Sequence, residues 1–343
     1  MQVEARPPLT AAVVGLGMMG RHHARLLQSL DGVRFVGAAD GAGDVHGVLA
    51  DPALLRSSVE ELVERDRPDM LVVAVPTEHH LPVVESAAAA GCHVLVEKPV
   101  AASVAEAERV IDACARAGVR GAVGHVERHN PALREMRRRI ADGQIGDVVA
   151  ISGERSGPFP DRIRDVGVVK DLASHDLDLA MWLGGAEVAS LAARTQFRAG
   201  RQHEDLVMVT GDLENGVSFN LQVDWLTPTK TRRTRVLGTD GMLVADSLRS
   251  ELQFYENGRV RIEWTQSQQF KGVSEGDVTR YALQQREPLR VELEAFRDLV
   301  TGDDDAPVVS LERGLCVLRA AEAALQSAST GSTVSLATVQ GAA

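Results

Sequence analysis

Mostly apolar runs alternate with amphipathic stretches over the first 124 residues of the chain. The apolar runs that predict buried strands lie at residues 11–14, 33–39, 70–75, 93–96 and 120–124. The helices predicted between them cover residues 18–30, 78–90 and 104–117. Because regular alternation of strand and helix is typical of a doubly wound parallel sheet, residues 1–124 are predicted to form an α/β Rossmann domain.

The remaining residues, 125–343, show strands separated by turn signals. The helices predicted here cover residues 130–142, 171–183, 291–301 and 311–328. The predicted strands lie at residues 188–195, 205–213, 217–225, 231–238, 242–246, 251–255 and 260–264. Asn-Gly dipeptides at 215–216 and 257–258 favour hairpins. This order predicts an α+β domain with a large, mostly antiparallel sheet that leaves one face open.

Composition and charge limit the classes of function. The formal net charge of −11 disfavours a general nucleic-acid or anionic-membrane surface, because both need a basic footprint. No apolar run is long enough to span a bilayer, and the first ten residues contain no apolar signal core. Cys92, Cys114 and Cys316 lie far apart and are expected to be buried, reduced thiols. We therefore expect a cytoplasmic protein that binds neither nucleic acid nor membranes.

The sequence VVGLGMMG predicts a dinucleotide site where the first strand gives way to a helix. Glycines at G-x-G-x-x-G spacing permit a tight turn and let backbone N–H groups approach a pyrophosphate. The contacts predicted in this turn are Gly15, Gly17, Met18, Met19 and Gly20. Asp40 follows 20 residues later at the end of the second strand, where a carboxylate accepts hydrogen bonds from ribose hydroxyls and repels a 2′-phosphate. NAD is therefore expected rather than NADP, and the alternative is that the glycines only form a turn.

Two further strand ends are expected at the edge of the sheet where ligands of open α/β sheets bind. Pro76, Thr77 and His80 follow the third predicted strand and are predicted cofactor contacts. The alternative for His80 is a surface histidine near a helix N-terminus. Glu97 and Lys98 follow the fourth predicted strand, at the same edge, and are also predicted cofactor contacts. Because a residue before proline is disfavoured in a helix, the ammonium of Lys98 is expected to point into the crevice.

In the second domain, Asp171, His175 and Asp178 lie at i, i+4 and i+7 of KDLASHDLDLAMW, one stripe of the predicted helix. A metal site, a proton relay and a solvated face all fit this spacing. The relay of Asp171 and His175 is favoured, because a metal-dependent enzyme would leave the dinucleotide motif without a use. Asp178 is expected to hydrogen-bond or cap structure nearby, so no metal site is predicted.

Together these motifs resemble the Gfo/Idh/MocA family (glucose–fructose oxidoreductase and inositol dehydrogenase). GxGxxG, AVPT with a following histidine, EKP and D-x-x-x-H occur in the family's order over nearly the whole chain. The resemblance implies hydride transfer between NAD and a secondary alcohol of a sugar or cyclitol. It also implies a catalytic group in which His175 acts as general base, Asp171 orients its imidazole, and Lys98 donates a hydrogen bond to the substrate oxygen.

The segments GHVERHNPALREM and GPFPDRIRDVGVV are similar to the family's UDP-N-acetylglucosamine 3-dehydrogenase branch. This implies oxidation of the 3-hydroxyl of a UDP-N-acetylhexosamine to the 3-keto sugar. The substrate contacts predicted on this basis are Arg128, Asn130, Arg162, Arg164 and His175. Guanidinium groups suit phosphate oxygens, and the alternative is that the arginines pair with nearby acids.

Other functions stay open at this point. One is another sugar or cyclitol oxidoreductase of the same family, such as an inositol dehydrogenase or a deoxysugar ketoreductase. Another is a dinucleotide-binding sensor without turnover, against which the intact Lys98, Asp171 and His175 argue. The resemblance also implies a homodimer or homotetramer that forms through the open face of the sheet.

Overall fold

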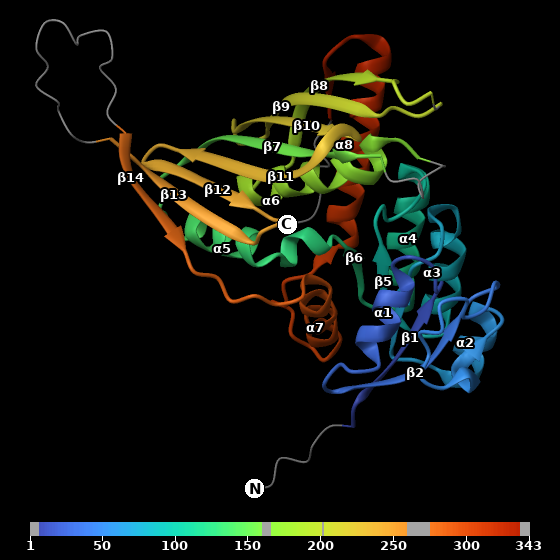
Figure 1. Cartoon of the computed structure of the whole chain (residues 1–343). Helices are drawn as coiled ribbons and strands as arrows, with labels where there is room; N and C mark the ends of the chain where they lie inside the picture. The colour runs from blue at the N-terminus through green and yellow to red at the C-terminus, as the bar shows by residue number, and fades with distance from the viewer. Residues whose placement is uncertain (1–6, 160–165, 201, 259–274, 337–343) are drawn as a thin grey trace, which may run out of the picture. The chain divides into compact units, whose positions relative to one another are not determined.

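The computed structural model describes residues 7–159, 166–200, 202–258 and 275–336. The chain divides into two compact units, and neither is continuous in sequence. Unit 1 comprises Met1–Val126 and Glu287–Leu318, and unit 2 comprises Glu127–Arg286 and Arg319–Ala343. The fold class predicted from the sequence is confirmed, because unit 1 contains a largely parallel sheet and unit 2 a large, mostly antiparallel one (Figure 1).

A seven-stranded sheet forms the centre of unit 1, with strand order β15-β6-β5-β4-β1-β2-β3. Its strands are β1 (Leu9–Val14), β2 (Val33–Ala39), β3 (Leu55–Arg56), β4 (Met70–Val73), β5 (His93–Glu97), β6 (Gly121–Gly124) and β15 (Val309–Ser310). All neighbours pair in parallel except β15, which is antiparallel to β6. Because the strand order reverses between β1 and β4, the carboxyl ends of these strands mark the edge where a ligand is expected.

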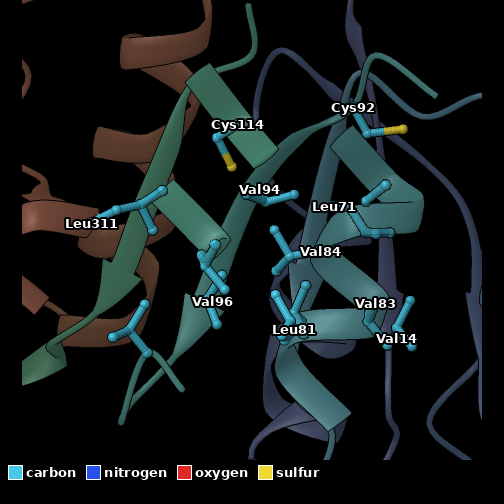
Figure 2. Packing of buried hydrophobic residues seen from close by; sticks show 14 of the residues in the cluster. Val14, Leu71, Leu81, Val83, Val84, Cys92, Val94, Val96, Cys114 and Leu311 are labelled. Carbon is cyan, nitrogen blue, oxygen red and sulfur yellow. The ribbon is translucent and has the colours of Figure 1, made fainter. Parts of the chain in front are cut away.

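Helices cover both faces of this sheet. They are α1 (Gly20–Leu27), α2 (Val59–Asp66), α3 (His80–Ala89), α4 (Val104–Ala117), α7 (Pro288–Val300) and the start of α8 (Leu311–Thr330), with the short turns η1 (Pro52–Leu54) and η2 (Thr77–His79). On one face, Val14 and Leu71 belong to the same core as Leu81 and Val84 of α3 (Figure 2). The core of the other face contains residues of α1 and α7, including the fully buried Phe296. Burial on both faces explains why these strands are mostly apolar.

The domain boundaries differ from the predicted ones at the C-terminal side. The predicted break after residue 124 lies close to the observed one at Val126, but the prediction assigns Glu287–Leu318 to the second domain. These residues belong to unit 1 because Leu293 of α7 shares a core with α1, and because β15 extends the edge of the sheet. By its sequence, an amphipathic helix such as α7 fits either sheet, so the pattern does not reveal its partner.

Unit 2 contains a nine-stranded sheet of order β14-β13-β12-β11-β7-β10-β9-β8-β16. Its strands are β7 (Val148–Pro158), β8 (Val188–Gln196), β9 (Leu206–Leu213), β10 (Ser218–Asp224), β11 (Leu226–Gly238), β12 (Gly241–Asp246), β13 (Glu251–Asn257), β14 (Glu275–Tyr281) and β16 (Val334–Ser335). Each neighbouring pair is antiparallel except β7 with β10. The helices are α5 (Pro131–Ala141), α6 (Ser174–Gly184) and the end of α8, with the turns η3 (Val126–His129) and η4 (Val169–Ala173).

The two faces of this sheet carry different side chains. Helices α5 and α6 cover one face of the sheet (Figure 1). Alternate strand residues are buried on that face, among them Ile151, Val209, Leu221, Val236 and Leu243. The residues between them lie on the open face and line a hollow of about 1000 Å³. Residues that line this hollow include Glu154, Met208, Gln222, Arg235 and Val244. The alternation confirms the open-faced sheet predicted from the sequence.

Most predicted elements are present within a few residues of their expected bounds. Strand β2 and helix α4 match their predicted ranges, and the hairpin at 215–216 joins β9 to β10 with Gly216 at a φ of +85°. The strand expected at 260–264 lies outside the described residues, and β13 pairs with β14 beyond it. In the part of the chain that the structure describes, no helix has the length and apolar character needed to cross a membrane.

Candidate active site

The loop between β1 and α1 carries the three glycines of the fingerprint. Gly15 has a φ of +90°, and a Cβ there would lie 2.5 Å from the carbonyl oxygen of Ala74. A Cβ on Gly20 would lie 1.7 Å from the carbonyl oxygen of Gly15, so packing requires glycine at both positions. A Cβ on Gly17 would meet no described atom within 4 Å. Packing therefore does not explain Gly17, which fits a position kept open for a group bound at the N-terminus of α1.

Asp40 fixes this loop from the end of β2. Its Oδ2 accepts a hydrogen bond from the N–H of Leu16 at 2.6 Å, and its Oδ1 accepts one from the N–H of Ala42 at 2.7 Å. Each carboxylate oxygen can accept a further hydrogen bond, so ribose hydroxyls can still bind there. Met19 directly precedes α1, and Met18 is 37% exposed. The open glycine, the helix N-terminus and the acid fit the adenosine half of a nicotinamide dinucleotide.

His80 is buried at the start of α3. Its Nδ1 and Nε2 each lie 3.0 Å from a backbone carbonyl oxygen, that of Pro99 and that of Val75 respectively. Burial lowers the pKa of His80, although the two carbonyls act in the opposite direction. The ring therefore lies between the segments that follow β4 and β5, and a contact of His80 with the cofactor remains a prediction. Thr77 begins the partly exposed turn η2, which Pro76 directly precedes and which ends just before His80.

Glu97 and Lys98 lie at the end of β5. Oε1 of the buried Glu97 is 2.7 Å from Nε2 of His23 on α1, and Oε2 accepts the N–H of Lys98 at 3.3 Å. Burial raises the pKa of Glu97, but the hydrogen bond and charge of His23, together with the charge of Lys98, lower it overall. Glu97 therefore supports the backbone that carries the half-buried Lys98. Sequence reasoning did not single out His23, which completes this support.

Asp171 lies in a π-helical turn, and His175 follows it in the first turn of α6. The sequence predicts one regular helix from residue 171, but η4 (Val169–Ala173) is π-helical and α6 begins at Ser174. The N–H of Asp171 donates to the carbonyl oxygen of Gly167 at 3.1 Å. Asp171 is half-buried and His175 is 9% exposed. Single π-turns within helices occur frequently at functional sites.

The next acids of this helix pair with arginines. Arg128, a predicted substrate contact, holds Asp178 through two hydrogen bonds of 2.8 and 2.5 Å. Its guanidinium carbon also lies 5.4 Å from the ring centre of Trp182. Asp176 accepts a hydrogen bond of 2.6 Å from Nε of Arg155. Asp178 therefore has the structural role that the sequence predicts for it.

The other predicted substrate contacts are Asn130 and two arginines of the loop after β7. Asn130 donates from Nδ2 to the carbonyl oxygen of Ser247 at 2.9 Å, and its Oδ1 accepts the N–H of Ala132 at 3.0 Å as the cap of α5. Arg162 and Arg164 lie outside the described residues. The structure thus gives Asn130 a local role, and the substrate contacts remain predictions.

The two halves of the predicted catalytic group belong to different units. Lys98 is in unit 1, and Asp171 and His175 are in unit 2. Among the described residues, no group of three or more histidine, cysteine, aspartate or glutamate side chains is arranged to hold a metal ion. Unit 1 therefore contributes the candidate dinucleotide site and a lysine, and unit 2 contributes an acid and an imidazole one turn apart.

Family models match both parts of the chain. The model for the oxidoreductase family with an NAD-binding Rossmann fold matches residues 9–125, and the Gfo/Idh/MocA C-terminal domain model matches residues 133–244. The UDP-N-acetylglucosamine 3-dehydrogenase of Acidithiobacillus ferrooxidans is 31% identical over 253 residues, which cover 73% of this chain and 78% of that protein. This chain belongs to the Gfo/Idh/MocA family of oxidoreductases.

Further relatives indicate the range of chemistry in the family. The solved structure of the A. ferrooxidans enzyme has a TM-score of 0.81 at 27% identity, covering 94% of this chain and 98% of that one. The scyllo-inositol 2-dehydrogenase (NAD(+)) of Bacillus subtilis is 27% identical, covering 70% of this chain and 74% of that protein. The D-xylose 1-dehydrogenase (NADP(+)) 2 of Haloferax volcanii is 28% identical, covering 95% of each. This member of the family is therefore a nicotinamide-dinucleotide-dependent dehydrogenase that acts on a CH–OH group of a sugar or cyclitol.

Proposed function

We propose that this enzyme oxidises the 3-hydroxyl of a UDP-N-acetylhexosamine to the 3-keto sugar with NAD. The observation that carries the proposal is the similarity to the A. ferrooxidans UDP-N-acetylglucosamine 3-dehydrogenase, whose structure covers 94% of this chain. The segments around Arg128 and Gly167, which resemble the same branch of the family, support the same substrate class.

Three side chains of this chain would move or hold the charge. When bound, NAD supplies the acceptor for the hydride that leaves the carbinol carbon. His175 takes the hydroxyl proton as general base, since an imidazole can titrate near neutral pH. Asp171 orients that imidazole and stabilises its charged form. Lys98 donates a hydrogen bond to the oxygen that becomes the carbonyl and stabilises its alkoxide-like charge. The substrate thus loses one hydride and one proton, and a C=O bond forms.

The assignment of NAD rests on the adenosine end of unit 1. The turn that contains Gly17 would hold the pyrophosphate, and Asp40 would bind the ribose hydroxyls. Because the Asp40 carboxylate lies against the glycine loop through Leu16, a 2′-phosphate placed there would meet its negative charge. Pro76 and Thr77 would contact the nicotinamide half.

The nucleotide-sugar diphosphate would be bound by arginines of unit 2. Asp178 uses two of the five N–H donors of Arg128, so this guanidinium can also donate to a phosphate oxygen. Arg162 and Arg164 would add positive charge, and Asn130 would contact the sugar.

A substrate panel tests the proposal. The purified protein would be mixed with NAD and, separately, UDP-N-acetylglucosamine, UDP-N-acetylgalactosamine, myo-inositol, scyllo-inositol and D-xylose, with NADH absorbance as the readout. We expect NADH only with the UDP-N-acetylhexosamines. A cyclitol that reacts while both nucleotide sugars are inert would contradict the substrate assignment.

Two substitutions test the roles of the side chains. His175→Asn and Lys98→Met should each lower kcat by about 10²- to 10⁴-fold, the usual contribution of a general base or a charge-stabilising donor. NAD affinity, measured by calorimetry, should change little. His79→Asn is the control, because this histidine is exposed at the surface of unit 1. Unchanged turnover in either variant would refute the assigned role.

A second candidate function is oxidation of a free sugar or cyclitol. The similarity to scyllo-inositol 2-dehydrogenase of B. subtilis favours this candidate, and the same panel distinguishes it. In that case Arg128 would serve only its pairing with Asp178.

We further propose that the enzyme forms a homodimer or homotetramer through the open face of unit 2. Alternate residues of seven strands are presented there, and several are apolar.

All three cysteines, Cys92, Cys114 and Cys316, are free thiols, which supports the predicted cytoplasmic location.

A further inference from the structure

The π-turn that carries Asp171 is held at its start by an acid from a distant part of unit 2. The residue before the turn, Val168, provides no side-chain cap. The N–H of Val169 donates instead to Oε1 of Glu204 at 3.0 Å, and the N–H of Val168 donates to the carbonyl oxygen of Glu204 at 3.0 Å. Because the first N–H groups of a helix have no partner within it, Glu204 takes the place of a local cap.

Gly167 leaves the space that this contact needs. A Cβ at residue 167 would lie only 2.0–2.1 Å from the carboxyl atoms of Glu204. The carbonyl oxygen of the same glycine accepts the N–H of Asp171 at 3.1 Å. Glu204 is 7% exposed, so its carboxyl is held in a buried position against the backbone that starts the turn.

Glu204 is itself anchored to the sheet through the next residue. The N–H of Asp205 donates to the carbonyl oxygen of Gln196 on β8 at 2.8 Å, and the N–H of Trp225 donates to the carbonyl oxygen of Asp205 at 2.9 Å. Oδ2 of Asp205 accepts two further backbone N–H groups from the loop after β8. The backbone of Glu204 is therefore fixed, and its side chain bridges from the sheet to the turn.

We propose that Glu204 is a positioning residue for Asp171 and His175: its reach to the N–H of Val169 sets the π-turn and, through it, the direction of both side chains. The inference rests on the proposed function, in which this pair handles the substrate proton. A displacement of about 1 Å at such a pair can cost about 10²-fold in rate. Neither Glu204 nor Gly167 has to touch the substrate for this effect.

Four substitutions separate reach from charge. Glu204→Gln keeps an acceptor oxygen at the same reach and should retain most of kcat. Glu204→Asp keeps the charge but is one methylene shorter, and Glu204→Ala removes the acceptor; both should lower kcat by about 10- to 100-fold with an unchanged KM for NAD. Gly167→Ala adds a methyl group where the Glu204 carboxyl lies, so it should displace that carboxyl and lower kcat to the same extent. The control is Ser58→Ala, which removes the cap of α2 in unit 1 and should leave kcat unchanged.

A second readout does not depend on turnover. The ring resonances of His175 and their pH titration, followed by NMR, should shift in Glu204→Asp and Gly167→Ala but not in Glu204→Gln or Ser58→Ala. If Glu204→Ala does not fold, the aspartate and glycine variants carry the test. Unchanged kcat and unchanged His175 titration in these variants would overturn the inference, and so would an equal loss in Glu204→Gln and Glu204→Asp. The two failures can be told apart. If the wild-type protein oxidises no sugar, the proposed function is contradicted. If the His175 resonances nevertheless shift in Glu204→Asp and Gly167→Ala, the positioning role is supported.

Discussion

The pKa values of two buried glutamates of unit 1 are shifted in opposite directions because their neighbours differ. Glu97 and Glu292 are 8% and 3% exposed. Against the effect of burial, pairing with His23 lowers the pKa of Glu97. Neither carboxyl oxygen of Glu292 has a hydrogen-bond partner among the described residues, and burial, with repulsion from Glu97, raises its pKa well above the usual value. Glu292 therefore stays protonated to a much higher pH than Glu97.

This difference predicts how Glu292→Gln changes the pH dependence of stability. The folded pKa of Glu292 lies above the unfolded value, so the unfolded chain releases this proton first and stability falls as pH rises between the two values. Glutamine cannot ionise, so it does not lose stability in this way. The free energy of unfolding of the variant, relative to that of wild type, should therefore be higher at about pH 8 than at about pH 5. Urea unfolding at both pH values measures this. The control is Glu64→Gln at an exposed position of α2, which should show no such difference. The same absence of a difference in Glu292→Gln would show that its carboxyl is ionised in the folded state.

The pair of His23 and Glu97 predicts a second effect on stability. His23→Leu leaves a buried carboxylate without its partner, which typically costs about 3–5 kcal/mol. In a Glu97→Gln background the same substitution should cost much less, because no buried charge is then left unpaired. Urea unfolding of the two single variants and the double variant gives the coupling. Additive losses would show that the contact of 2.7 Å contributes nothing beyond packing.

Sequence reasoning proposes site residues where a pattern surrounds them, and it does not single out residues whose contacts are distant in sequence. Lys98, Asp171 and His175 stand at strand ends or helical spacing that a reader of the sequence can recognise. His23 and Glu204 instead act on residues that lie 74 and 35 positions away in sequence. A single polar residue in an apolar helix or a loop has no periodic signal, so such partners appear only once the fold is known.

At the scale of elements, the central strand β7 was not predicted, because it too depends on contacts with residues distant in sequence. Its sequence, VVAISGERSGP, breaks the alternation of a half-buried strand with glycines and adjacent charges. Arg155 is nevertheless buried, because Asp176 and Glu127 accept its hydrogen bonds at 2.6 and 2.8 Å. A Cβ on Gly153 would lie 2.7 Å from Cδ2 of Leu221, so any larger residue there needs the Leu221 side chain to shift. The compensation comes from other elements, and the pattern of one strand cannot show it.

The loop between β1 and α1 predicts that its glycines fail in different ways when substituted. Gly20→Ala places a Cβ 1.7 Å from the carbonyl oxygen of Gly15 and should lower the free energy of unfolding by about 1–3 kcal/mol or more. Gly17→Ala meets no described atom within 4 Å and should change stability by less than about 0.5 kcal/mol. It should nevertheless weaken NAD binding at least about 10-fold, since the added methyl group occupies the approach of the pyrophosphate. Thermal unfolding and NAD calorimetry measure the two effects. Wild-type NAD affinity in Gly17→Ala would show that the cofactor does not approach this turn.

At the scale of the molecule, the chain builds each unit from segments far apart in sequence. Unit 1 receives α7 and β15 from the C-terminal part, and α8 begins in unit 1 and ends in unit 2. The sequence predicts the kind of each layer, because strand runs and helical periodicity report burial. It does not predict which layer the C-terminal helices join, because helices of similar amphipathicity compete for both sheets and only the packing of residues such as Phe296 decides.

The open face of unit 2 predicts how the molecule associates. A sheet face with apolar side chains around a hollow of about 1000 Å³ gains stability when a second copy covers it. Met208 lines this hollow and is 50% exposed. Arg194 lies directly opposite Met208 on the neighbouring strand β8 and lines the same hollow. Because Met208→Arg would place two like charges side by side in the proposed interface, it should convert the proposed oligomer into a monomer in sedimentation velocity experiments. Val45→Arg introduces the same charge at a site of unit 1 that is 70% exposed and should leave the assembly intact. If wild type sediments as a monomer, or Met208→Arg remains oligomeric, the open face is not the interface.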